Sequence, residues 1–214
     1  MNSDRVARWY RWLEYCAFGR ALERRRFSYL GRLAAAERIL ILGEGDGRML
    51  EKLRDIAPWA TIEIVELSAG MIALARGRVG RSERIRFLRG DARRTKIPED
   101  AYDGLVTCFF LDCFEEADAR DLVERCARAL KSGGIWLVSD FTIPLGGWQR
   151  WHAVAWIWVM YRFFWIATGL RTKQLPPIEK LLQSSGVRRV ARDEERAGMM
   201  MSEVWIRPPD SERP

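Results

Sequence analysis

Three glycines at alternate positions follow a short apolar run in the first quarter of the chain. The run spans residues 38–42, and the glycines are Gly43, Gly45 and Gly47. Glycine has no Cβ, so it permits a tight turn and lets the backbone approach a ligand closely. A second apolar run ends in Glu66, whose carboxylate could accept both hydroxyls of a ribose from the tip of a strand. This layout predicts a nucleotide-cofactor site.

The charge of the glycine loop indicates which cofactor it binds. In the dinucleotide fingerprint the third glycine comes three residues after the second, and a helix N-terminus faces a pyrophosphate. Here Arg48 takes that place, and the acids Glu44 and Asp46 lie within the loop. These carboxylates would repel a pyrophosphate but would attract a ligand carrying an ammonium and a sulfonium. Residues 42–47 resemble the first motif of class I S-adenosylmethionine-dependent methyltransferases. The resemblance implies that S-adenosylmethionine is the cofactor; a nicotinamide enzyme and a non-catalytic relative are the alternatives.

Three further segments follow in the order found in this family. Residues 86–92 end in Gly-Asp-Ala, where the family places an acid against the adenine amino group, so the resemblance gives Asp91 that role. Residues 102–112 form a nearly continuous apolar run, typical of a buried parallel strand. Residues 129–134 resemble the turn before the family's fifth strand, here 135–140. The cofactor-binding residues predicted from these segments are Gly43, Glu44, Gly45, Gly47, Glu66, Leu67, Met71, Asp91, Ala92, Cys108 and Phe109.

The order of predicted elements gives the fold class: α/β, with a Rossmann-like, mostly parallel seven-stranded sheet and helices on both faces. Two strand-like segments, 187–192 and 200–207, have too short a gap between them for a crossover helix, so they must be antiparallel. By the resemblance, an antiparallel last strand distinguishes this fold from nicotinamide-binding sheets. We expect one domain over residues 1–214. Its parts are a helical lid (1–36), the cofactor-binding core (37–140), a substrate-side insertion (141–175), and a C-terminal helix with the antiparallel pair (176–207).

The composition fits a globular domain with a basic surface. Hydrophobic residues make up 48% of the 214, and 36 basic against 29 acidic side chains give a net charge of +7. The arginines are spread along the chain, which is typical of a solvated surface or of a preference for anionic partners. The cysteines have no paired spacing, so we expect reduced thiols, no disulfide and no metal; they are Cys16, Cys108, Cys113 and Cys126. There is no signal-peptide pattern, so the expected location is the cytoplasm, with peripheral membrane contact as an option.

Two segments outside the core are expected to select the substrate. Aromatic residues recur at helical spacing near the N-terminus, which indicates a helix that covers the sheet edge or closes over the substrate. This opening also loosely resembles that of the ubiquinone and menaquinone biosynthesis C-methyltransferases, although Arg11 replaces their acid. Residues 148–170 hold half of the ten tryptophans, and their apolar run is shorter than the ~20 residues that span a bilayer. They could roof a hydrophobic substrate, contact a membrane surface or form a homodimer. The predicted substrate-binding residues are Tyr10, Tyr15, Trp148 and Trp151.

Methyl transfer is an in-line displacement that depends on placing the nucleophile in a dry pocket. Phenol, enol and carbon nucleophiles must also lose a proton. The catalytic candidates are His152, which is the chain's one histidine and could instead be structural, and Asp112 and Asp140 at the ends of the fourth and fifth strands. We therefore expect methyl transfer to a hydrophobic aromatic or lipid-like small molecule, without nucleic acid. The alternatives are a non-catalytic S-adenosylmethionine-binding module and an RNA or protein methyltransferase.

Overall fold

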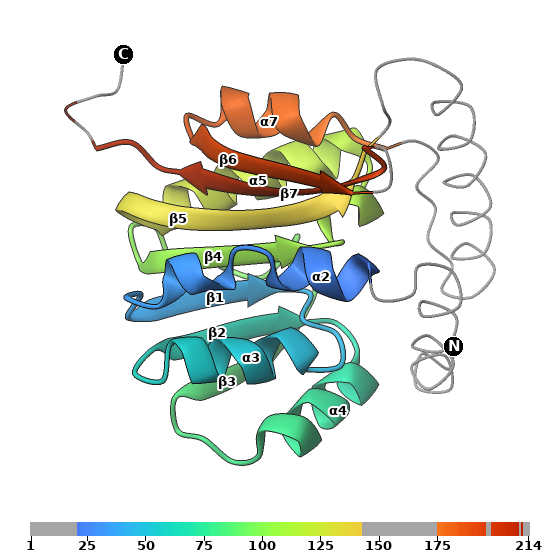
Figure 1. Cartoon of the computed structure of the whole chain (residues 1–214), viewed down its shortest axis with the longest axis vertical. Helices are drawn as coiled ribbons and strands as arrows, with labels where there is room; N and C mark the ends of the chain where they lie inside the picture. The colour runs from blue at the N-terminus through green and yellow to red at the C-terminus, as the bar shows by residue number, and fades with distance from the viewer. Residues whose placement is uncertain (1–20, 143–174, 196–197, 210, 212–214) are drawn as a thin grey trace.

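The computed structural model describes residues 21–142, 175–195, 198–209 and 211. Its centre is a seven-stranded sheet with the order β3-β2-β1-β4-β5-β7-β6 (Figure 1). The strands are β1 Arg38–Leu42, β2 Thr61–Glu66, β3 Ile85–Arg89, β4 Tyr102–Cys108, β5 Leu130–Phe141, β6 Arg188–Glu195 and β7 Met200–Ile206. β7 pairs antiparallel with both β5 and β6, and the pairs among β1 to β5 are parallel. The predicted fold class and its antiparallel last strand are confirmed.

β1 lies inside the sheet because its side chains are apolar on both faces. Ile39, Leu40, Ile41 and Leu42 are each at most 1% exposed. β1 pairs with β2 on one side and with β4 on the other, so the strand order reverses between β1 and β4. In open α/β sheets, ligands bind at the carboxyl ends of the strands beside such a reversal.

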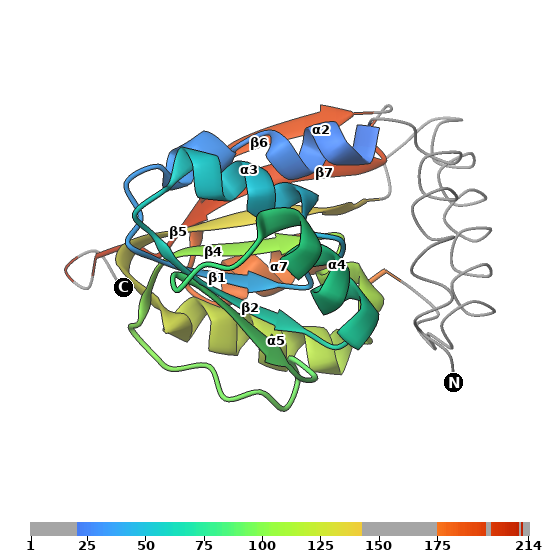
Figure 2. The ribbon, with the colours of Figure 1, turned by 90° about the horizontal axis from the view of Figure 1, so that it is seen from below.

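Helices cover both faces of the sheet (Figure 2). On one face lie α2 (Ala21–Phe27), η1 (Leu30–Leu33), α3 (Arg48–Ile56) and α4 (Ala69–Val79); on the other lie α5 (Glu116–Ala129) and α7 (Ile178–Ser184). Leu30 and Leu33 are completely buried and pack in the same core as Ile39. Residues 21–33 of the expected lid are therefore part of the layer that covers the sheet, and residues 1–20 and 143–174 lie outside the described residues.

The largest differences from the predicted strand boundaries are at the end of β4 and at the start of β5. β4 ends at Cys108, and not at residue 112, because Phe109 has a positive φ of 52° and turns the chain into the short helix η2 (Leu111–Cys113). β5 begins at Leu130, in the segment predicted as a turn. Leu130 pairs with Tyr102, after which the register shifts so that Ile135 pairs with Gly104. Apolar periodicity identified both strands but not these local departures from regular pairing.

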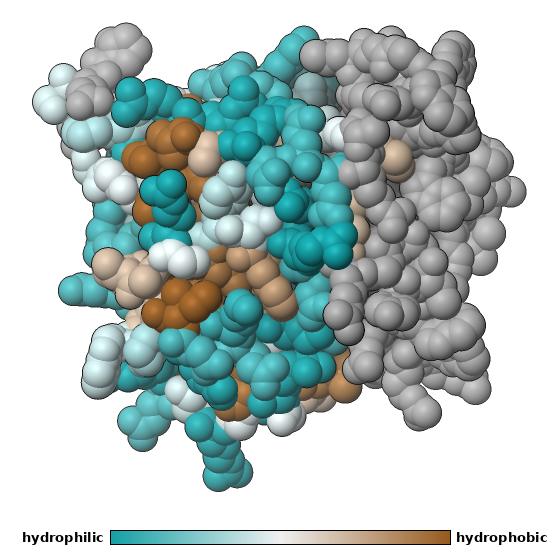
Figure 3. All heavy atoms as spheres, viewed as in Figure 1, coloured by the Kyte–Doolittle hydropathy of each residue, from teal (hydrophilic) through white to brown (hydrophobic). Residues whose placement is uncertain are grey.

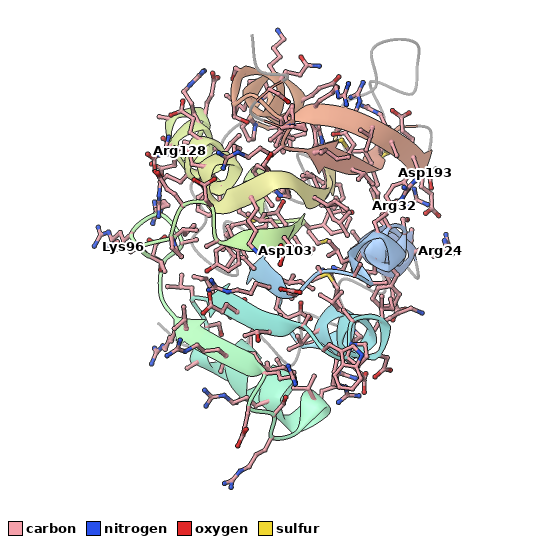
Figure 4. The ribbon with its side chains drawn as sticks, turned by 90° about the vertical axis from the view of Figure 1, so that its left-hand side faces the viewer. Arg24, Arg32, Lys96, Asp103, Arg128 and Asp193 are labelled. Carbon is pink, nitrogen blue, oxygen red and sulfur yellow. The ribbon has the colours of Figure 1, made fainter. Side chains whose placement is uncertain are left out.

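The amino ends of the parallel strands are tied together by polar contacts. Figure 4 views this side, with Asp103 near its centre. The Asp103 carboxylate accepts hydrogen bonds from the Arg38 backbone N–H at 2.9 Å and from Lys131 Nζ at 2.7 Å. These contacts join β1, β4 and β5 at the edge opposite the expected ligand site.

The face that carries α2 and α3 is mainly hydrophilic, with small hydrophobic areas between the elements (Figure 3). Among the described residues, the large apolar side chains that are more than a third exposed are Trp59, Leu67, Leu74, Leu88 and Val190. Among the described residues, no helix combines the length and the hydropathy that crossing a membrane requires.

Candidate cofactor and active site

The three loop glycines have different surroundings. A Cβ on Gly43 would overlap the Phe110 ring, and one on Gly47 would lie 2.6 Å from the Ala75 Cα. A Cβ on Gly45 would have nothing within 4 Å, and all three glycines have a positive φ. Gly43 and Gly47 therefore allow close internal packing, whereas Gly45 leaves the backbone open to a ligand.

The Glu66 carboxylate is fixed at the tip of β2 by two backbone groups. Its Oε1 accepts from the Ser68 N–H at 2.9 Å, and its Oε2 accepts from the Gly45 N–H at 3.3 Å. The Ser68 side chain also caps α4 by accepting from the Met71 N–H. Each carboxylate oxygen has a second lone pair, so Glu66 can still accept two ribose hydroxyls. Leu67, 67% exposed, follows directly. Contact of these residues with the nucleoside part of S-adenosylmethionine stays a prediction.

Asp91 follows β3 and is held by a neighbouring arginine that the sequence did not single out. Arg93 Nη2 lies 2.7 Å from the Asp91 carboxylate, and Arg93 also pairs with Asp118 at 2.9 Å. The hydrogen bond from Arg93 lowers the pKa of Asp91. Ala92 is buried beneath this turn. Asp91 is thus kept ionised, and its contact with an adenine amino group stays a prediction.

The acids of the glycine loop contact the protein itself. Glu44 Oε1 accepts from the Leu50 N–H at 2.8 Å, in the first turn of α3. Burial raises the pKa of Glu44 to about 8, and its Oε2 has no hydrogen-bond partner in the described part of the chain. Asp46 pairs with Arg48 at 3.0 Å and with Arg78 at 3.6 Å. The sequence analysis did not predict these contacts within the protein. It expected both acids to face the ammonium of a ligand. The ammonium contact predicted for Glu44 remains a prediction.

The tip of β4 places two aromatic rings beside the loop. The Cys108 thiol points into the core, 3.7 Å from Met49 Sδ, and burial raises its pKa to about 12. The Phe109 ring contacts Phe141 with centroids 4.9 Å apart, and Phe110 packs against Gly43. Phe110 was absent from the predicted site, although the apolar run that contains it was recognised.

Two buried carboxyl groups lie close together: Asp112, which is in η2 and not at the predicted end of the fourth strand, and Asp140 near the end of β5. Asp112 is 4% exposed and Asp140 is fully buried. Burial raises the pKa of both, and the Asp112 carboxyl raises the pKa of Asp140 further. No described residue makes a hydrogen bond of regular geometry with the Asp140 carboxyl oxygens. When two carboxyl groups share a buried site, the protonated form of one is favoured, and the other can accept a proton when it is ionised. Their catalytic role stays a prediction.

Five other predicted site residues lie outside the described residues: Tyr10, Tyr15, Trp148, Trp151 and His152. The three cysteines that are described, Cys108, Cys113 and Cys126, are free thiols. Within the described ranges, no group of histidine, cysteine and acidic side chains could hold a metal ion.

Comparison with known proteins finds a matching family model and similar curated proteins. Residues 39–134 match a family model described as a methyltransferase domain. The demethylmenaquinone methyltransferase of Thermus thermophilus is 32% identical over 133 residues, which are 61% of this chain and 60% of that protein. The chain spans about half the length of the curated relatives it matches.

Solved structures share the fold at low sequence identity. The N-methyltransferase NodS from Bradyrhizobium japonicum WM9, in complex with S-adenosylhomocysteine, is 18% identical with a TM-score of 0.64, covering 88% of each chain. An O-methyltransferase family protein from Burkholderia thailandensis is 19% identical with a TM-score of 0.68, covering 98% of this chain and 64% of that one.

The sheet order, the glycine loop and the fixed Glu66 carboxylate define a Rossmann-like nucleotide-cofactor domain. Together with the methyltransferase-domain match over residues 39–134, these features support a class I S-adenosylmethionine-dependent methyltransferase with S-adenosylmethionine as its cofactor.

Proposed function

We propose that the chain transfers the methyl group of S-adenosylmethionine to a hydrophobic small molecule that is aromatic or lipid-like. The observation that carries the proposal is the Glu66 carboxylate, held by the N–H of Gly45 where the loop is open. The name of the Thermus thermophilus relative, a demethylmenaquinone methyltransferase, supports an acceptor of this kind.

The strand order supports an orientation for the donor. Asp91, Glu66 and Gly45 follow the neighbouring strands β3, β2 and β1, and β4 is next in the sheet. If Asp91 meets the adenine and Glu66 the ribose, the donor's methionine part extends past the loop toward β4. When bound, S-adenosylmethionine supplies an electrophilic methyl group. The acceptor would then lie beside the ends of β4 and β5.

The acid pair at those ends suits an acceptor that must lose a proton. Asp112 lies in η2, just after β4, and Asp140 lies near the end of β5; their raised pKa values favour a protonated carboxyl beside one that can take up a proton when ionised. A phenol or an enol needs such a base before its oxygen or carbon attacks the methyl group. Phe109 and Phe110 supply an apolar surface close by, which favours an aromatic acceptor.

The proposal is tested with methyl-labelled S-adenosylmethionine and cell extracts divided into lipid, small-molecule and macromolecular fractions. We expect protein-dependent label in the lipid or small-molecule fraction. Glu66→Ala should abolish most of it, whereas Glu51→Ala, a change on the exposed part of α3, should not. Label in RNA or protein would establish the macromolecular alternative. Binding of S-adenosylhomocysteine without any transfer would establish the non-catalytic one.

A further inference from the structure

The Asp91 carboxylate accepts several hydrogen bonds from Arg93, two residues further along the chain. The Arg93 backbone N–H donates to Oδ1 at 3.0 Å, and Nη2 donates to Oδ2 at 2.7 Å. Arg93 Nε lies 3.1 Å from both oxygens. Among the described residues, no other group donates to this carboxylate. An ionised carboxylate has about four acceptor positions, so these contacts leave room for a further N–H donor from a ligand.

Arg93 also connects the turn after β3 to α5. Its Nη1 lies 2.9 Å from the carboxylate of Asp118, in the first turn of α5. Its backbone carbonyl accepts from Arg125 Nη1 at 2.7 Å, further along the same helix. Both the backbone and the side chain of Arg93 are therefore held, and the guanidinium can keep the Asp91 carboxylate in one orientation. Such support is expected around a residue that contacts a ligand.

Two aromatic rings continue this connection to the glycine loop. The Arg93 guanidinium carbon lies 5.9 Å from the centroid of the Phe114 ring. Phe114 meets Phe110 edge to face, with centroids 5.0 Å apart, and the Phe110 ring fills the space beside Gly43. The position of Asp91 is thus linked by packed side chains to the loop that would hold the rest of the donor.

We propose that Arg93 is a positioning residue for the base of the donor: it turns the Asp91 carboxylate so that its open acceptor position meets the amino group of adenine. The inference rests on the proposed function, in which Asp91 contacts the adenine. A guanidinium that contacts a carboxylate through two N–H groups fixes orientation as well as charge. Orientation is the contribution that matters near pH 7, because an aspartate of ordinary pKa is already ionised there.

This role makes Arg93 a determinant of which base is accepted. A carboxylate that is held in place can only accept hydrogen bonds, so it favours a ring that carries an N–H donor at this position. A ring without that donor would leave the carboxylate unpaired, at a cost in affinity. A carboxylate that is free to rotate could turn toward water instead, and the preference between the two rings would become small.

The test compares two ligands by calorimetry: S-adenosylhomocysteine and an analogue in which hydrogen replaces the amino group of the purine. The wild-type chain should bind the first at least about 10-fold more tightly, because a hydrogen bond to a charged group is lost in the second. Arg93→Gln should reduce this preference to about 3-fold or less, while affinity for the analogue changes little. Arg93→Lys keeps the charge without the two-point contact, so it should resemble Arg93→Gln more than the wild type.

Two further variants separate positioning from other effects. Asp91→Ala should abolish the preference, and adding Arg93→Gln to it should change the preference no further, since both act through one carboxylate. Arg94→Gln is the matched control. It removes the same charge from the next position, where the side chain is exposed and forms no ion pair with a described residue, and it should keep the full preference.

Several outcomes would overturn the proposal. Equal losses for the two ligands in Arg93→Gln would make Arg93 a structural residue, and an unchanged preference would remove its positioning role. If this variant does not fold, Asp118→Asn, which removes the contact of Arg93 with α5, should lower the preference; a full preference there would contradict the proposal. Equal affinities of the wild type for both ligands would exclude the adenine contact of Asp91. Absence of S-adenosylhomocysteine binding by the wild type would instead contradict the proposed function itself.

Discussion

At the scale of single residues, Glu66 is the proposed ligand contact, because its carboxylate accepts from two backbone N–H groups, one of them that of Gly45 in the glycine loop. We expect Glu66→Ala to weaken S-adenosylhomocysteine binding by about 1–3 kcal/mol, since charge-assisted hydrogen bonds to the ribose are lost. Calorimetry measures the change, with Glu51→Ala as the control. Unchanged affinity, or tighter binding of a nicotinamide dinucleotide by the wild type, would contradict the assignment.

Glu44 makes the stability of the ligand-free chain depend on pH. Burial raises its pKa from 4.5 to about 8, so folding favours the protonated form. Between these values the unfolded chain has already lost the proton that the folded chain retains, and stability falls as pH rises. Glu44→Gln should be more stable than the wild type by about 1–3 kcal/mol at pH 8, with little difference at pH 4. Urea unfolding at a series of pH values tests this. A constant difference across the series would mean that Glu44 is not the titrating group.

The acid pair gives a kinetic prediction. If Asp112 and Asp140 take the acceptor's proton, Asp140→Asn and Asp112→Asn should each lower the methylation rate by about 10²-fold while S-adenosylhomocysteine affinity stays constant. Because the pKa of each carboxyl is raised, the wild-type rate should rise with pH as the pair ionises. The control is Asp121→Asn on the exposed side of α5. Wild-type rates in both variants would leave His152 as the candidate base.

At the scale of elements, different glycines of the loop have different roles. One allows close packing, and another leaves the backbone open to a ligand. Gly45→Ala should cost about 1–2 kcal/mol of stability, because a positive φ strains alanine, and should also weaken S-adenosylhomocysteine binding. Gly47→Ala should cost more stability, since its Cβ would lie 2.6 Å from α4 backbone. Gly133→Ala is the control, because Gly133 has a φ of 75° with nothing within 4 Å and lies away from the loop. If Gly45→Ala and Gly133→Ala bind equally well, the open face at Gly45 is not a ligand contact.

At the scale of the whole molecule, the prediction concerns residues 148–170, which lie outside the described residues. If this tryptophan-rich segment covers the substrate pocket, the protein should not co-sediment with anionic vesicles at any salt concentration. Replacing Trp156 and Trp158 with serine should then raise KM or unfold the domain, because buried hydroxyls would have no partners. Salt-sensitive co-sedimentation that these changes abolish would support membrane contact instead.

The sequence by itself was sufficient to predict the strands, the glycine loop and the position of Glu66 at the tip of β2. These features depend on local patterns: continuous apolar runs, alternate glycines and an acid at a fixed distance. The short gap between the last two strands likewise required their antiparallel pairing, which the structure has. A pattern within a few residues is sufficient in each case.

Only the tertiary structure decided where the charged side chains point. Glu44 turns toward α3, Asp112 meets Asp140, and Arg26 reaches the Phe109 ring. The last two contacts join residues far apart in the sequence, and the pKa values of the acids depend on burial that no local pattern reveals. Chain folding brings the ends of several strands to one edge of the sheet, so the chemistry of that edge belongs to the assembled domain.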